Sequence, residues 1–65
     1  MDNRLESAFL KQFRAQGCQV AVYLRNGYGM VGKIVDFDDH VIVIETEGKQ
    51  KLVYKDFVST VRKWD

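Results

Sequence analysis

The spacing of apolar residues changes once along this chain, at Gly17, and the change separates a helical part from a strand part. The apolar positions before it recur at intervals of four: Leu5, Phe9 and Phe13. This is the spacing of one helix face. We therefore predict a helix over about residues 4–16, with Asn3 as its N-cap and Gly17 as the left-handed residue that ends it.

After Gly17 the apolar period becomes two, which is typical of strands. In residues 19–25 the side chains of Val20, Val22 and Leu24 are expected on one face. The dipeptide Asn26-Gly27 favours a two-residue type I′ turn. Such a turn pairs cross-strand neighbours and places four side chains together on the opposite face. These four residues are Tyr23, Arg25, Tyr28 and Met30.

Three glycines within six residues weaken what is otherwise a good strand sequence, so each is expected to have a role. Gly27 makes the turn, and Gly29 is expected opposite Leu24 on the core side. Gly32 is expected at a sharp bend inside a long strand that reaches about Phe37.

Three further strands follow, separated by turns at 36–40 and at 46–50, where Gly48 lies. They cover residues 41–45, 51–54 and 57–63, and the first of them is apolar enough to be buried on both faces. The predicted fold class is mainly β, in which an N-terminal helix precedes a strongly bent five-stranded antiparallel sheet. Residues 1–65 form a single domain.

A chain of 65 residues buries only about 60% of the surface that it exposes when unfolded, so its stability is marginal, and this chain has few ways to compensate. Cys18 is the only cysteine and His40 the only histidine, so neither an intrachain disulfide nor a metal cluster is expected. Cys18 has two interpretations, a small buried side chain that fills space in the core or a reactive thiol. A lone cysteine also suits a reducing, cytoplasmic setting. The long apolar last strands either pair with another chain or close a barrel on themselves.

The composition excludes several classes of protein. The net charge of +1 does not by itself indicate a nucleic-acid binder. There is no signal peptide and no apolar run of 18 residues, so no membrane partner is expected. A single histidine leaves no catalytic constellation to assemble, and no cofactor is expected. A binding module is therefore favoured over an enzyme.

Two short motifs give the chain a family resemblance. The first lies within about residues 20–45 and the second within about 50–62. They comprise Asn26-Gly27, Gly32, Phe37 and Asp38, then Tyr54-Lys55 and Ser59-Thr60. With the helix before them, these motifs resemble the bacterial Sm-like proteins of the Hfq family, in the form found in Gram-positive bacteria.

The resemblance implies a homohexameric ring in which neighbouring chains join through their fourth and fifth strands. It also implies binding of single-stranded RNA. In this family such binding pairs small regulatory RNAs with messengers, so the chain is expected to be an RNA chaperone in post-transcriptional regulation.

The helix-side, or proximal, face of the family binds uridine-rich RNA, and this chain departs from its pattern. The corresponding positions here are Glu6, Asp39, His40, Lys55 and Asp56. His40 can still stack on a base. The four charged residues sum to −2 per chain, which predicts weak RNA binding on this face. Two of these residues also have a purely structural interpretation. Glu6 can stabilise the N-terminus of the helix, and Asp39 can shape the turn in which it lies.

The rim of the family's ring carries an arginine patch late in the helix. Only Arg14 fits this pattern, with Lys11 one turn before it. A solvated helix face explains both residues as well, so annealing of paired RNAs is in doubt.

The opposite, distal face of the family binds adenine-rich RNA through the first two strands. The positions here are Tyr23, Arg25, Asn26, Gly27, Tyr28, Gly29 and Met30. Aromatic rings stack on bases, and Asn26 and the backbone near Gly27 and Gly29 can meet an adenine edge. The competing interpretation is a cross-strand aromatic pair that serves the sheet.

Function therefore has a leading hypothesis and two alternatives. The leading one is a distal-face binder of A-rich RNA. The first alternative is a ring-forming assembly module that has lost RNA binding, in a possible mixed ring with a paralogue. The second is a self-closed barrel that acts as an adaptor.

Overall fold

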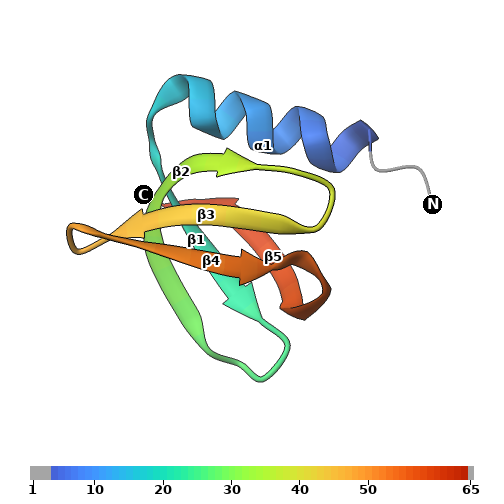
Figure 1. Ribbon diagram of the computed structural model, residues 1–65, viewed down its shortest axis with the longest axis vertical. Helices are drawn as coiled ribbons and strands as arrows, with labels where there is room; N and C mark the ends of the chain where they lie inside the picture. Colours follow the sequence, from blue (N-terminus) through green and yellow to red (C-terminus); the bar gives the residue numbers. More distant parts are fainter. Residues whose placement is uncertain (1–3, 65) are drawn as a thin grey trace.

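The computed structural model describes residues 4–64, which form one helix packed across a strongly bent antiparallel sheet (Figure 1). The elements are α1 (Arg4–Gln16), β1 (Gln19–Leu24), β2 (Gly29–Phe37), β3 (Val41–Thr46), β4 (Lys49–Tyr54), the short 3-10 turn η1 (Lys55–Phe57) and β5 (Val58–Lys63). The predicted fold class and the order of its elements are confirmed.

Helix α1 ends as predicted, and it buries only part of its predicted apolar stripe. Gly17 has a φ of +64° and donates its N–H to the Phe13 carbonyl at 3.1 Å. Leu10 is only 2% exposed, whereas Leu5 and Phe9 are 80% and 60% exposed. Since a turn has 3.6 residues, Leu10 and the half-buried Phe13 share the face toward the sheet. The predicted cap at Asn3 lies outside the described residues.

The sheet is open, with two unpaired edges. Its strand order is β4-β3-β2-β1-β5, so β4 and β5 each have a neighbour on one side only. Among the described residues, no hydrogen-bonded ladder joins β4 to β5, and the sheet does not close into a barrel through its backbone. The last two strands therefore present unpaired edges.

The β1–β2 turn differs from the prediction. Gly27 donates to the Leu24 carbonyl at 3.0 Å, and Leu24 donates to Tyr28 at 2.8 Å, so the loop has three residues, 25–27. The Asn26 side chain accepts the Tyr28 N–H at 2.9 Å, and only Gly27 adopts a positive φ, of 90°. The predicted two-residue type I′ turn is wrong here. Such a turn occurs instead between β3 and β4, at residues 47–48, where both φ values are positive.

The longer loop changes which side chains share a face. Tyr23 pairs with Gly29, and Met30 pairs with Val22 on the core side. A change of register by one residue moves a side chain to the other face of a strand. The predicted common face of Tyr23 and Met30 is therefore wrong. The predicted position of Gly29 opposite Leu24 is also wrong.

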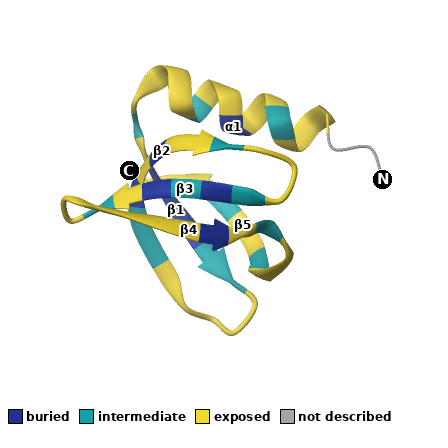
Figure 2. Cartoon of the chain, in the orientation of Figure 1, coloured by how far each residue is buried: buried dark blue, intermediate teal, exposed yellow. Residues whose placement is uncertain are grey.

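The core lies inside the bend of the sheet and under α1 (Figure 2). Its buried members are Leu10, Val20, Val22, Ile34, Ile42, Ile44 and Val53. The other apolar residues of β3, Val41 and Val43, are only half-buried, so this strand is fully covered on one face and not on both as predicted. A Cβ on Gly32 would collide with the Glu45 carbonyl, and glycine thus lets β3 approach the bent β2. Cys18 packs half-buried against the core, in agreement with a filler.

Candidate nucleic-acid interface

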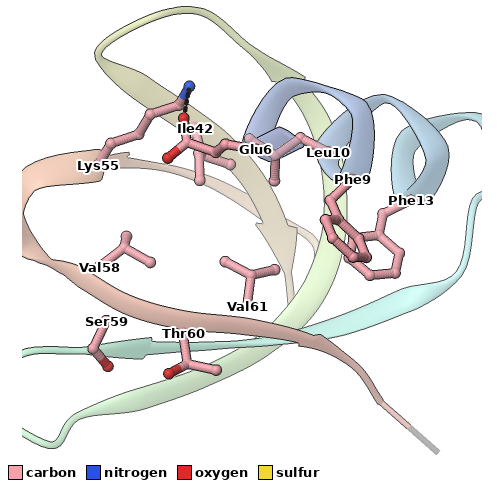
Figure 3. A pocket seen from close by; sticks show the side chains of 10 residues that line it. All are labelled: Glu6, Phe9, Leu10, Phe13, Ile42, Lys55, Val58, Ser59, Thr60 and Val61. Carbon is pink, nitrogen blue, oxygen red and sulfur yellow. Dashed lines mark hydrogen bonds and ion pairs between the residues drawn. The ribbon is translucent and has the colours of Figure 1, made fainter. Parts of the chain in front are cut away.

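A groove beside the helix is lined by two of the five residues that the resemblance assigns to the proximal face, Glu6 and Lys55. Its volume is about 240 Å³ (Figure 3). It is lined by Glu6, Phe9, Leu10, Phe13, Ile42, Lys55, Val58, Ser59, Thr60 and Val61. The close view shows Lys55 and Glu6 extending toward each other across one end of this groove.

The Lys55 ammonium is engaged by the chain itself. Its Nζ lies 2.8 Å from a Glu6 carboxylate oxygen and 5.5 Å from the centre of the Phe37 ring. The Lys55 side chain is only 9% exposed. Its backbone N–H donates to the His40 carbonyl at 2.9 Å, which brings Glu6, His40 and Lys55 to one place. Lys55, the one cation among the five assigned proximal residues, is therefore largely neutralised and covered.

The neighbouring carboxylates keep this face acidic. Asp38 accepts the backbone N–H groups of His40 and Val41 at 2.8 and 2.9 Å, and these bonds hold the pKa of Asp38 below its usual value. Asp38 is thus ionised at neutral pH and shapes the β2–β3 turn. Asp39 and Asp56 are exposed and form no bond with other residues of the 4–64 segment.

The rim arginine is also paired within the chain. Arg14 donates to the Asp36 carboxylate at 2.8 Å, and its guanidinium lies 5.2 Å from the Phe37 ring. Both partners remain partly exposed, so the pair is screened by solvent. Lys11 is exposed and makes no bond with other described residues. Lys11 lies one turn before Arg14 on α1, so the rim positions carry one paired cation and one that is unpaired among the described residues.

Tyr23 lies on the outer face of the sheet, opposite the core. A Cβ on Gly29 would lie 3.0 Å from the Tyr23 ring, so the ring occupies the space that glycine leaves. Arg62 donates from Nη2 to the Tyr23 hydroxyl at 3.3 Å, and its guanidinium carbon lies 5.9 Å from the ring centre. Our sequence reasoning missed Arg62. The period-two alternation of β5, which places Thr60 and Arg62 beside Tyr23 and Ala21, is the signal that would have found it.

The other distal residues lie at the end of the β1–β2 hairpin, away from α1 (Figure 1). Tyr28 is 55% exposed, and the Arg25 side chain is exposed with no hydrogen bond or ion pair to residues 4–64. A second groove of about 590 Å³ begins here and runs along β4. It is lined by Leu24, Arg25, Asn26, Met30, Lys51, Leu52, Val53, Tyr54 and Phe57. One chain therefore places Tyr23 and Met30 on different surfaces.

Other kinds of site find no support in the described part of the chain. Within residues 4–64, no three His, Cys, Asp or Glu side chains are grouped so as to hold a metal ion. No described helix has the length and apolarity needed to cross a membrane. The remaining chemistry is that of exposed aromatic rings, unpaired cations and free strand edges.

A helix placed before a strongly bent five-stranded sheet defines an Sm-like domain. The family model for Hfq protein matches residues 5–64, and the chain belongs to this family. It is 46% identical over 57 residues to the RNA-binding protein Hfq of Desulfitobacterium hafniense, which covers 88% of this chain and 69% of that protein. It is 45% identical over 56 residues to the RNA-binding protein Hfq of Geobacillus sp. (strain WCH70), covering 86% and 76%.

Solved structures show the same fold. The 1.55 Å crystal structure of the pleiotropic translational regulator Hfq superposes with a TM-score of 0.88 at 34% identity, covering 91% of this chain and 98% of that one. An Hfq protein from Anabaena sp. superposes with a TM-score of 0.84 at 17% identity, over 92% of this chain and 97% of the other.

Proposed function

We propose that this chain binds single-stranded, adenine-rich RNA through its distal residues, as a homohexameric ring that acts in post-transcriptional regulation in the cytoplasm. Membership of the Hfq family supports RNA as the ligand, because the relatives compared above are named RNA-binding proteins. The choice of face is specific to this chain and follows from its charges.

One contrast between the two faces carries the proposal. On the helix side, Lys55 and Arg14 are each paired with a carboxylate at 2.8 Å, and of the proximal and rim cations only Lys11 is left unpaired among residues 4–64. On the other side, Tyr23 lies beside Arg62, and no carboxylate of residues 4–64 pairs with Arg62 or Arg25. Since RNA affinity grows with the number of phosphates that free cations neutralise, the outer face is the better RNA surface.

The open edges support the ring. The backbone N–H groups of Lys55 and Trp64 donate into the sheet, to the carbonyls of His40 and Gln19. Along an antiparallel strand, the N–H groups of successive residues point alternately into the sheet and away from it. The N–H groups of Leu52, Tyr54 and Val61 therefore point away from the sheet. Pairing β4 of one chain with β5 of the next would satisfy them. It would also cover exposed apolar side chains at β4 and η1: Leu52, Tyr54 and Phe57.

A ring also explains how separated distal residues can act together. Tyr23 and Met30 lie on different surfaces of one chain, so a single chain does not offer both to one base. In a ring, Tyr23 of one chain and Tyr28 with Met30 of its neighbour form a shared base pocket. Asn26, Gly27 and Gly29 supply polar contacts there, and Arg25 meets phosphate.

Of the two alternative functions, one conflicts with the fold and the other does not. An open sheet with edges at β4 and β5 contradicts the self-closed barrel. A ring-forming assembly module without RNA binding, alone or mixed with a paralogue, uses the same edges and differs only in its ligand.

Titration with short RNAs tests the proposal. Labelled oligo(A) and oligo(U), followed by fluorescence anisotropy, should show saturable binding of oligo(A) and much weaker binding of oligo(U) at neutral pH. No binding of either RNA to an assembled ring would favour the assembly module. Tighter binding of oligo(U) would place the RNA on the helix side instead.

The same titration of the Glu6→Gln variant tests whether the Glu6–Lys55 pair limits RNA binding on the helix side. This variant lacks the carboxylate that neutralises Lys55 and keeps the side-chain length. We expect its affinity for oligo(U) to rise severalfold and its affinity for oligo(A) to stay the same, because a freed cation can neutralise a phosphate. Unchanged oligo(U) binding would show that the Glu6–Lys55 pair does not limit this face.

A further inference from the structure

The end of β5 adds a row of side chains to the outer face that the distal assignment does not include. The guanidinium of Arg62 lies 5.9 Å from the Tyr23 ring and 5.3 Å from the Trp64 ring. The Trp64 backbone N–H donates to the Gln19 carbonyl at 2.9 Å, which anchors this residue to the start of β1. Arg62 thus lies between two aromatic rings.

The strand register places all three side chains on one face. Tyr23 pairs with Thr60 and Ala21 pairs with Arg62, and the Trp64–Gln19 bond extends this ladder by one pair. Alternate residues of β5 therefore face the same way as Tyr23. Ala21, whose strand partners are Val31 and Arg62, is only 1% exposed although it lies on this outer face. The row is thus a packed surface.

The chemistry of the row suits a nucleotide. Arg62 donates to the Lys63 carbonyl at 3.2 Å and to the Tyr23 hydroxyl at 3.3 Å, and no carboxylate of residues 4–64 pairs with it. A guanidinium carries five N–H donors, so donors remain for a phosphate. Trp64 is 43% exposed, and its indole ring offers a stacking surface beside that cation.

We propose that Arg62 and Trp64 form an additional nucleotide-binding position next to Tyr23, in which Trp64 stacks on a base and Arg62 binds the adjoining phosphate. The alternation of ring, cation and ring matches the alternation of base and phosphate along a single strand. This proposal rests on the proposed RNA-binding function and lengthens the RNA path from β1 to the end of β5. It predicts that a longer oligo(A) binds each chain through more than the Tyr23 pocket.

The tryptophan itself reports on the proposal, because Trp64 is the only one in the chain. Unlabelled oligo(A) is titrated into the intact protein while tryptophan emission is recorded, and free N-acetyltryptophanamide corrects for absorption by the RNA. We expect the emission to change and to saturate at the RNA concentration at which anisotropy saturates. Oligo(U) at the same concentrations should leave the emission nearly unchanged.

Variants separate stacking from charge. Trp64→Leu should weaken oligo(A) binding about fivefold or more, and Trp64→Phe should restore most of the loss. Arg62→Gln should weaken binding, and the slope of log affinity against log salt concentration should fall by about one, as expected for the loss of one phosphate contact. The matched control is Lys63→Gln, the same loss of charge one residue away on the opposite face of β5, which should change affinity less than twofold.

Each outcome decides between the claims. If oligo(A) binds by anisotropy while the emission stays constant, and Trp64→Leu and Arg62→Gln bind like the parent, the additional position is refuted and the proposed function stands. If oligo(A) does not bind at all, both are refuted. Should Trp64→Leu fail to assemble, the emission titration of the unchanged protein decides alone.

Discussion

Replacing Val61 with proline is expected to separate the ring into single chains of 7.6 kDa. The Val61 N–H points toward the free edge of β5, as the alternation from the Trp64–Gln19 bond indicates. Proline removes this donor, and its ring obstructs an incoming strand. Size-exclusion chromatography with light scattering measures the mass directly.

The control for this variant is Val61→Ala. Alanine keeps the N–H but removes most of a half-buried side chain, so the variant should unfold at a lower temperature and still assemble. A proline variant that remains folded with the parent's mass would show that the β5 edge does not join the chains. A monomeric parent at micromolar concentration would contradict the ring itself.

Replacing Tyr23 with alanine is expected to weaken oligo(A) binding severely while the ring stays intact. Each lost base stack costs about 1–3 kcal/mol, and one oligo(A) strand that follows the ring loses several such stacks. Tyr23 is half-buried above Gly29 and contributes little to the core, so assembly should survive. Anisotropy with labelled oligo(A) and light scattering on the same sample measure both properties.

Tyr23→Phe is the matched variant for this test. It keeps the ring and removes only the hydroxyl that accepts from Arg62, so binding should stay close to that of the parent. If tyrosine served only the sheet, the alanine variant would lose thermal stability with little change in RNA affinity. That result would refute the assignment of Tyr23 to RNA.

Local sequence signals predicted most of the fold. The four-residue spacing and Gly17 located α1, and the period-two pattern located β1, because these signals act within a few residues. The dipeptide Asn26-Gly27 located the hairpin but not its turn type. The Asn26 side chain accepts the Tyr28 N–H and so caps the loop. In this loop only Gly27 has a positive φ, whereas the predicted turn required two residues with positive φ.

The candidate site was less predictable, because its contacts join distant segments. A register error of one residue was enough to place Tyr23 and Met30 on one face. The Glu6–Lys55 pair crosses 49 residues and the Arg62–Tyr23 bond crosses 39. The residues assigned to each face could be summed for charge from the sequence, but only the fold shows which cations are paired and which are unpaired among the described residues.

RNA is proposed to lie on the outer face and at the end of the β1–β2 hairpin, and hydrogen exchange tests this position most directly. The intact protein is exchanged with and without saturating oligo(A), and peptides are analysed by mass spectrometry. We expect slower exchange in residues 23–31 and in residues 60–64, with no change in residues 38–41 and 55–57. Protection of 38–41 and 55–57, with residues 23–31 unchanged, would contradict the account.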